Sequence, residues 1–399
     1  MTTPTPEQPR FPMERESPYD PPPGILRLLR EEPVSRVTLW DGHEAWLVTR
    51  YDDVRTLLTN PDLSADVRRP GYPKVSAALA HFTEGLLNHM DSPEHDVYRR
   101  MLAPDFMVKR VESLRGDVEK LVDDLLDAMQ THGTPVDLVA SFAFPIPALV
   151  TCSILGVPYE RKDFFVRCAE AFLSGTSTAE AAAAAGRELH AYLGELIEAK
   201  KTAPGTDTLS RMVTEYVASG QLDETVLVTL AELLLIAGFD TTANMIALGT
   251  LTLLRHPDQL EELKADPGLW PGAVEELLRY LTITHRGRHR VATADIEVGG
   301  QLIRAGEGII AAQDAANRDP DTFADPDVLD IHREARHHLA FGHGVHQCIG
   351  AAVARVELQV AYARLFARFP GLELAVPHDE IRFKHESSVY GVAELPVRW

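Results

Sequence analysis

One cysteine of this chain lies in a setting that could do chemistry. Cys348 falls within the segment FGHGVHQCIG, residues 341–350, just ahead of a stretch typical of a helix. Glycines there let the backbone approach a flat group closely, and a helix start stabilises a thiolate. Such a thiolate can be the axial ligand of a haem iron and favour O–O bond cleavage. The alternative is an inert cysteine, which we expect for Cys152 and Cys168.

A polar group interrupts the most apolar stretch of the chain. Asp240, Thr241 and Thr242 follow Ala237 and Gly238 inside a helical pattern that starts near Asp223. A buried carboxylate needs partners, and threonine hydroxyls can bond back to the preceding turn and bend or open a helix. We therefore expect either a local widening with room for a small ligand and water, or a kink whose polar groups are satisfied.

Charged residues recur at helical spacing. Glu276 and Arg279 are three residues apart on one face, although a solvated surface pair has the same spacing. His95 and Arg99 share a face after the helix-start signal Asp91-Ser92-Pro93. Arg290 and His346 are further basic residues, and arginine is well suited to bind a carboxylate. The alternatives are that His95 caps a helix and that Arg290 is a surface charge.

The segment around Cys348 resembles the haem-binding loop of the cytochrome P-450 superfamily, Phe-Gly-x-Gly-x-His-x-Cys-x-Gly, and matches every fixed position. The resemblance implies haem b (iron protoporphyrin IX), with Cys348 as the proximal ligand. It also implies that Phe341 shields the sulfur and that Gly342 and Gly350 belong to the haem site.

The resemblance assigns roles to the other motifs. Asp240 and Thr241 would be the acid–alcohol pair that relays protons to dioxygen, with Thr242 added and Ala237 and Gly238 beside the haem. Glu276, Arg279 and Arg333 would form a buried network that is structural rather than catalytic. The haem propionates would be bound by His95, Arg99, Arg290 and His346.

The resemblance covers nearly the whole chain, from Asp41-Gly42 to Tyr390-Gly391, and is strongest to soluble actinomycete enzymes of polyketide and macrolide tailoring. The implied fold is mainly α with a smaller β part. It is a triangular prism with the haem between a long central helix and the helix after the cysteine loop. We expect a single domain over residues 25–399, after a disordered or extended lead over residues 1–24.

Local patterns agree with a mainly α chain. Strand patterns flank two hairpin signals, at 36–48 and 295–304, and a further strand follows at 308–312. Strands drawn from both ends of the chain favour one interlocked domain. Helical patterns cover residues 51–58, 94–102, 110–130, 188–200, 208–219, 223–254, 271–281 and 351–369.

Composition narrows the class of protein. The 399 residues include 39 basic and 59 acidic side chains, a net charge of −20, which disfavours binding to nucleic acid or an anionic membrane. Three cysteines without paired spacing argue against a disulfide framework. No apolar leader precedes the fold, and the run Leu227–Phe239 is too short to span a bilayer. We expect a cytoplasmic monomer without membrane or nucleic-acid partners.

These features predict a haem-thiolate monooxygenase of secondary metabolism, including antibiotic biosynthesis. It would insert one oxygen atom of O2 into a mid-sized, mostly apolar polyketide, macrolide or terpenoid. No dinucleotide-binding fingerprint is present, so electrons would come from NAD(P)H through ferredoxin reductase and ferredoxin. Alternatives are a peroxide-using peroxygenase of the same fold and a haem- or ligand-binding protein without turnover.

The substrate pocket is predicted by resemblance alone, from the regions 64–87 and 172–185 and from Leu234, Ile283, His285, Arg286 and Val389. Residues 284–290, THRGRHR, are more polar than the equivalent stretch usually is. His285 and Arg286 could meet a hydroxyl, a carboxylate or a sugar of the substrate. Arg286 could instead point to solvent or to a propionate.

A donor protein needs a docking surface. Ferredoxins are usually acidic, so we expect a basic patch around the cysteine loop, although scattered surface charges would look the same in the sequence. The candidates are Arg99, Arg100, Lys109, Arg110, Arg355, Arg364 and Arg368.

Overall fold

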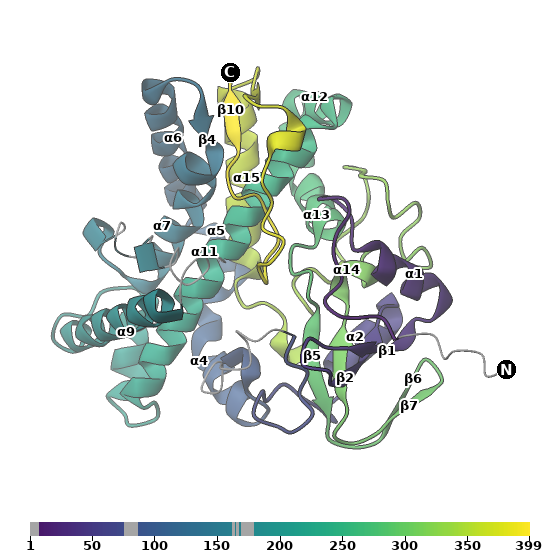
Figure 1. Ribbon diagram of the computed structural model, residues 1–399. Coiled ribbons are helices and arrows are strands. Elements are labelled where there is room, and N and C mark those ends of the chain that lie inside the picture. Colours follow the sequence, from purple (N-terminus) through teal and green to yellow (C-terminus); the bar gives the residue numbers. More distant parts are fainter. Residues whose placement is uncertain (1–7, 76–86, 162–163, 165–166, 169–178) are drawn as a thin grey trace. The chain divides into compact units, whose positions relative to one another are not determined.

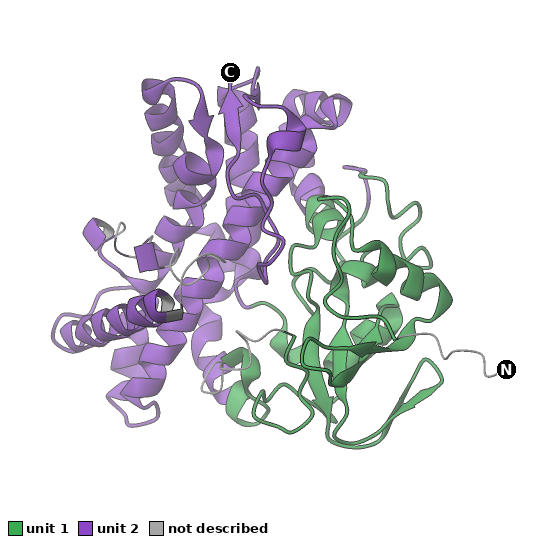
Figure 2. Ribbon diagram, in the orientation of Figure 1, with its two compact units in different colours: residues 1–96, 275–329, 334–348 green, residues 97–274, 330–333, 349–399 purple. Residues whose placement is uncertain are grey.

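The protein divides into two compact units, each assembled from separate stretches of sequence (Figure 2). The computed structural model describes residues 8–75, 87–161, 164, 167–168 and 179–399. Unit 1 comprises residues 1–96, 275–329 and 334–348, and unit 2 comprises residues 97–274, 330–333 and 349–399. The expectation of one domain over residues 25–399 therefore stays a prediction.

Unit 1 is built on a five-stranded sheet of order β1-β2-β8-β5-β3 (Figure 1). Its strands are β1 (Val34–Thr38), β2 (Glu44–Val48), β3 (Leu63–Ser64), β5 (Arg288–Ala292) and β8 (Gly308–Ala311), and β6 (Ile296–Val298) pairs with β7 (Gln301–Ile303). Its helices are α1 (Pro23–Glu31), α2 (Tyr51–Thr59), η1 (Leu87–His89), α14 (Gln313–Ala316) and η6 (Gly344–His346). Helices α4 (Glu94–Phe106) and α13 (Trp270–Leu281) cross the division along the chain.

The sheet of unit 1 joins the two halves of the sequence. Strand β2 pairs antiparallel with β1 and parallel with β8, with Leu47 opposite Ile310. Both of those side chains are fully buried, because inward-facing apolar residues of adjacent strands form the core. The described part of the N-terminal lead packs on the same unit, since buried Phe11 donates its amide to the Thr38 carbonyl at 2.9 Å.

Unit 2 is mainly helical, with the long helix α11 (Glu224–Leu254) running through it (Figure 1). Its other helical segments are α5 (Val108–Glu112), α6 (Arg115–His132), η2 (Val139–Ala143), α7 (Pro145–Leu155), η3 (Tyr159–Arg161), α9 (Ala179–Thr202), α10 (Thr208–Met212), η4 (Val213–Val217), α12 (Pro257–Ala265), η5 (Pro267–Leu269), α15 (Ala351–Arg368) and η7 (His378–Glu380). A small sheet has the order β4-β10-β9, from Val136–Asp137, Pro396–Arg398 and Glu373–Leu374.

Helix α11 is held by neighbours that approach its backbone closely. It packs against α7, α9 and α15. At Gly249 an added Cβ would lie 2.0 Å from the hydroxyl of Tyr362 on α15, and that hydroxyl donates to the Met245 carbonyl at 2.5 Å. By length and hydropathy α11 alone, among the described helices, could cross a membrane. Its packing inside unit 2 is that of a core helix.

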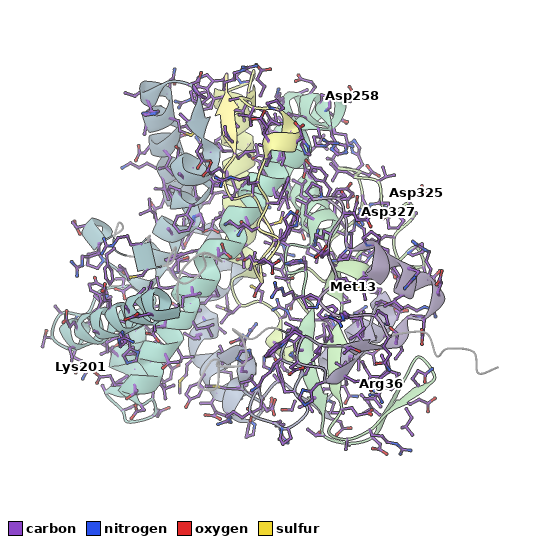
Figure 3. All side chains as sticks on the ribbon, viewed as in Figure 1. Met13, Arg36, Lys201, Asp258, Asp325 and Asp327 are labelled. Carbon is purple, nitrogen blue, oxygen red and sulfur yellow. The ribbon has the colours of Figure 1, made fainter. Side chains whose placement is uncertain are left out.

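The sequence-based expectation of a mainly α protein with a smaller β part is confirmed. The expected strands occur within a few residues of their predicted ends. Strand β5 was not predicted, because its run of arginines and a histidine lacks the alternation of apolar and polar residues typical of a strand. Helices α1, α7 and α12 were also missed. Each unit carries ion pairs, such as Arg36 with Glu307 and Lys201 with Glu224, each at 2.5 Å. Figure 3 labels Arg36 and Lys201.

Candidate active site

The cysteine loop is shaped by two glycines in the left-handed region. Gly342 and Gly344 have φ values of +75° and +73°, which side-chain-bearing residues rarely adopt. A Cβ on Gly344 would also lie 2.4 Å from the Leu58 carbonyl oxygen of α2. The amide of Cys348 donates to the Phe341 carbonyl at 2.8 Å, which closes the loop. Glycine is therefore required here by backbone conformation and by contact with α2.

The loop presents its cysteine at the surface of unit 1. Cys348 is exposed and forms no disulfide. The next helix, α15, begins at Ala351 with Gly350 at its N-cap, as the sequence predicted. Cys152 and Cys168 are buried, and burial raises the pKa of Cys152 to about 12. Only Cys348 has the exposure that a ligand to an external group requires.

Three of the four predicted propionate-binding residues lie in unit 1. The rings of His95 and His346 are 4.2 Å apart between centroids, and His95 Nδ1 lies 3.0 Å from an Asp96 carboxylate oxygen. Arg290 is 7% exposed, so the alternative of a surface charge is wrong. Arg99 lies one turn beyond His95 on α4 and is half-buried.

These residues fit a haem. Buried cations are normally paired with anions. Among the described residues no carboxylate forms an ion pair with Arg290, whose guanidinium donates to the His289 carbonyl at 2.7 Å. An iron porphyrin would bring two carboxylates for such cations and an iron for an exposed thiolate. The donor set of unit 1 therefore suits haem.

The pair Glu276–Arg279 is buried rather than solvated. Arg279 Nε and Nη2 donate to the two Glu276 carboxylate oxygens at 2.7 and 2.8 Å, and both side chains are fully buried. Arg279 also donates to the carbonyls of Asn317 and Pro326 at 2.8 and 2.9 Å. The surface-pair alternative is therefore wrong. Arg333 is half-buried in a turn of unit 2, and its part in this network stays a prediction.

On α11, one face of an otherwise buried helix is open. Ala237 is exposed and Thr241, one turn later, is half-buried. The Thr241 hydroxyl donates to the Ala237 carbonyl at 3.0 Å, the back-bond predicted from sequence. The helix nevertheless remains α-helical over Glu224–Leu254, so the predicted local widening is absent. Ala237 and Thr241 therefore mark the accessible side of α11.

Asp240 is the centre of a polar network in unit 2. Asn244 Nδ2 donates to the Asp240 carboxylate at 2.7 Å and to its carbonyl at 2.8 Å. Lys384 Nζ donates to Asn244 Oδ1 at 3.0 Å and lies 3.8 Å from Asp240 Oδ1. Oδ2 of Asp240 is buried without a hydrogen-bond partner among the described residues. Burial raises the pKa of Asp240, and the charge of Lys384 opposes that rise.

Gly238 and Thr242 are explained by packing inside unit 2. A Cβ on Gly238 would lie 2.5 Å from the Thr151 hydroxyl of α7. Thr242 is buried next to Glu357 of α15. Burial raises the pKa of Glu357 to about 8, and a hydrogen bond from Thr242 opposes the rise. The haem contact of Gly238 and the catalytic role of Thr242 stay predictions.

The predicted pocket residues divide between the units. Ile283, His285 and Arg286 are buried in unit 1, whereas Leu234 is buried and Val389 half-buried in unit 2. Arg286 is 9% exposed, so the alternative that it points to solvent is wrong. Residues 76–86 of one predicted pocket region and 172–178 of the other lie outside the described residues.

Only some of the seven candidate residues can contribute to the predicted basic patch. Arg364 binds Glu119 and Asp123 at 2.9 and 2.6 Å, and Arg368 binds Asp127. Those two charges are therefore neutralised by α6. The exposed candidates that form no ion pair within the described part of the chain are Arg100, Lys109 and Arg110, next to the exposed apolar side chains of Met107 and Val108.

Sequence reasoning missed Asn244, Lys384, Glu357 and Arg288. Asn244 follows Asp240 by four residues, a spacing that places both on one helix face and could have revealed it. Lys384 and Glu357 are brought to α11 by tertiary packing, and no local pattern predicts that contact. Arg288 lies in the unpredicted strand β5.

Comparison with known proteins agrees with this geometry. The cytochrome P450 family model matches residues 269–396. The chain is 50% identical to cytochrome P450-SU2 of Streptomyces griseolus, over 96% of this chain and 94% of that relative. It is 49% identical to pentalenic acid synthase of Streptomyces avermitilis, over 98% of this chain and 97% of that relative.

Solved structures give the same result. The crystal structure of GfsF is similar with a TM-score of 0.94 and 46% identity, covering 98% of this chain and all of that one. CYP105P1 in complex with filipin I is similar with a TM-score of 0.92 and 44% identity, covering 98% and 99% of the two chains. The expected fold and enzyme class are therefore confirmed. This chain belongs to the cytochrome P450 family of haem-thiolate monooxygenases.

Proposed function

We propose that this P450 inserts one oxygen atom of O2 into a C–H or C=C bond of a mid-sized, mostly apolar secondary metabolite. The observation that carries the proposal is the exposed Cys348 in its glycine-shaped loop. Relatives support the substrate class: one is named a pentalenic acid synthase, and another was solved with filipin I. The protein acts as a cytoplasmic monomer in this proposal.

The cofactor of the proposal is haem b. Cys348 would bind the iron through its sulfur, and His95, His346, Arg290 and Arg99 would hold the propionates. A haem with a thiolate ligand supplies the iron that activates dioxygen and favours O–O cleavage. The two histidine rings, at 4.2 Å, offer neighbouring N–H donors to one carboxylate.

Asp240 and Thr241 handle the protons of the reaction. A general acid works best when its pKa lies near the working pH, and burial shifts the pKa of Asp240 upward in that direction. Asn244 and Lys384 hold Oδ1, which leaves Oδ2, without a partner among the described side chains, as the oxygen that would carry the proton. Consecutive residues of a helix do not face each other. A water therefore carries the proton from Asp240 Oδ2 to the Thr241 hydroxyl.

Electrons arrive from a ferredoxin that is reduced by an NAD(P)H-dependent ferredoxin reductase. The docking surface in this proposal consists of Arg100, Lys109 and Arg110 with the exposed Met107 and Val108, whose exposed fractions are 59% and 67%. Apolar contacts at the centre and cations at the edge suit an acidic partner and a brief encounter.

The test is a spectral titration of the purified protein with polyketides, macrolides and terpenoids, followed by turnover with a ferredoxin and its reductase under isotopically labelled O2. We expect a low-to-high-spin shift with at least one class, and a product that contains one labelled oxygen atom. A product whose oxygen comes from water, or turnover that proceeds with peroxide but never with the electron-transfer partners, would contradict the proposal.

A further inference from the structure

Strand β5 carries two arginines on one face. Arg288 and Arg290 are opposite Ala311 and Ile309 of β8, two positions apart in the register. Side chains alternate along a strand, so these two point the same way and His289 points the other way. Two positive charges are therefore held next to each other by the backbone of a sheet.

Neither charge is neutralised by the protein. In the described part of the chain, no carboxylate lies within ion-pair distance of Arg288 or Arg290, and the guanidinium of Arg288 forms no hydrogen bond there. The carboxylate whose charge acts on Arg290 is Asp91, which already accepts from the Ser64 hydroxyl and the Ala65 amide at 2.5 and 2.7 Å. Arg290 is buried and Arg288 is half-buried, and cations that are partly withdrawn from water without a counter-charge favour a bound anion.

The three rings around this pair are neutral at neutral pH. Burial lowers the pKa values of His89 and His289 to about 4 and raises that of Tyr72 to about 12. The Tyr72 ring lies 6.4 and 6.2 Å from those two histidine rings. His289 Nε2 is engaged with the Arg286 carbonyl at 2.9 Å. These rings thus supply aromatic surface and a phenol hydroxyl, while Asp91 is a carboxylate whose charge acts on Arg290 from beyond ion-pair distance.

The haem does not need both arginines. Its two carboxylates would already be matched within unit 1 by Arg290 and by the contacting rings of His95 and His346. Arg288 is additional to that set. Burial lowers the pKa of Arg288, and the charge of Cys348 opposes that fall. A ligand carboxylate on Arg288 would supply a second opposing charge.

We propose that Arg288 binds the carboxylate of an organic-acid substrate, while Arg290 serves a haem propionate. This inference rests on the haem-thiolate function proposed above and narrows its substrates to mid-sized apolar molecules with one carboxylate. The bond is charge-assisted, and the guanidinium suits the planar acid group. The apolar remainder of the substrate is then oriented by an anchored end.

The test compares an imidazole-tethered fatty acid with its methyl ester, in a series of tether lengths, by spectral titration of the holoenzyme. The imidazole binds the haem iron directly, so that binding does not depend on a guess of the natural substrate. We expect the acid to bind more tightly than the ester at one tether length or more. In Arg288→Gln the affinity for the acid should fall roughly ten- to hundredfold, which corresponds to the loss of one charge-assisted hydrogen bond. The affinity for the ester should be unchanged.

Three controls separate the outcomes. Arg288→Lys keeps the charge and should retain part of the preference for the acid, whereas Arg304→Gln, at an exposed arginine of unit 1 that pairs with Asp295, should change nothing. Transfer of haem from the enzyme to an apo-globin measures the rate of haem loss. It tests the alternative that Arg288 binds a propionate of the haem rather than the carboxylate of a substrate. Faster haem loss from Arg288→Gln with an intact preference for the acid assigns Arg288 to a propionate and overturns the inference, as does equal binding of acid and ester by the wild type. In either case the reduced CO complex would keep its red-shifted thiolate band. Absence of that band would instead contradict the proposed haem-thiolate function.

Discussion

The cysteine loop of unit 1 and the Asp240 region of unit 2 are built in different ways. The loop is fixed by backbone conformation, with two left-handed glycines and a bond from the Cys348 amide to the Phe341 carbonyl. The Asp240 region is a regular helix whose polar side chains are fixed by partners from elsewhere, above all Lys384. A metal ligand needs one rigid position, whereas a proton donor needs a tuned pKa, and the two constructions match those needs.

The largest expected effect comes from the buried pair that stiffens unit 1. In Glu276→Gln the guanidinium of Arg279 loses its buried counter-charge, which we expect to cost about 3–5 kcal/mol of unfolding free energy. Urea denaturation of the haem-loaded protein measures it. Glu261→Gln breaks an exposed pair with Lys264 at the same spacing and should cost about 0.5 kcal/mol or less. Similar losses in both variants would remove the claim that unit 1 depends on this pair.

Unit 2 carries a buried acid that costs stability. The folded pKa of Glu357, about 8, lies above that of an unfolded glutamate. Between those two values the folded state keeps a proton that the unfolded state has released, so stability falls as the pH rises towards 8. Glu357→Gln removes this dependence. Its stability gain over the wild type should be larger at pH 9 than at pH 6 by on the order of 2 kcal/mol.

Urea titrations at the two pH values measure the effect of Glu357→Gln, with Glu373→Gln at an exposed site of the same unit as the matched control. A gain for Glu357→Gln that is equal at both pH values would mean that this carboxyl is ionised normally in the folded protein.

Thr241→Ala tests the relay on α11 directly. Loss of the hydroxyl should leave substrate binding intact and divert NAD(P)H consumption from product to peroxide by roughly a hundredfold, the low end of proton-transfer effects. Peroxide and product are measured per NAD(P)H oxidised. Thr229→Ala removes a hydroxyl that makes the same back-bond on the same helix, to Thr225 at 3.1 Å, and should couple normally. Normal coupling in Thr241→Ala would end the relay assignment.

Lys384→Met tests the Asp240 region separately, because it changes the pKa of Asp240 without substituting any residue of α11. Removal of the positive charge lets burial raise that pKa further. Asp240 then stays protonated to higher pH, and the alkaline limb of the coupling profile should move up with it. Lys264→Met, at a lysine far along the sequence and paired with Glu261, is the control. An unmoved profile would show that Lys384 does not tune the acid.

The smallest effect is expected at the proposed docking surface for ferredoxin. Arg100→Glu with Arg110→Glu should slow reduction by ferredoxin a few-fold at low salt, and the difference should shrink as salt rises, while substrate-induced spin shifts stay unchanged. Stopped-flow reduction measures this, with Arg382→Glu at another exposed arginine as the control. Equal slowing in both proteins would mean that the change in net charge, and not this surface, causes the slower reduction.

The two regions also differ in how far sequence predicts them. The cysteine loop lies within ten contiguous residues, and its glycines are demanded by local φ values, so its pattern is readable in the sequence. Asp240 and Thr241 are readable too, but Lys384 is 144 positions from Asp240 along the chain and Glu357 is 115 from Thr242. Those contacts arise from helix and tail packing, for which one sequence holds no local signal.

Strand β5 shows a different limit. Its residues Arg288 to Arg290 alternate in direction but not in polarity, so the alternating pattern that identifies a strand is missing. The strand exists because β8 and β3 pair with it on either side. Its unusual polarity, noticed in the sequence as a departure from relatives, is the feature on which the carboxylate-binding inference depends.

The central claim is that Cys348 is the thiolate ligand of the haem, and the CO-difference spectrum of the reduced protein tests it most directly. The wild type should show the red-shifted band of a thiolate-ligated haem. Cys348→His should bind haem without that band, while Cys152→Ala and Cys168→Ala should keep it. A wild-type spectrum that lacks the band, or a band that survives in Cys348→His, would contradict the account.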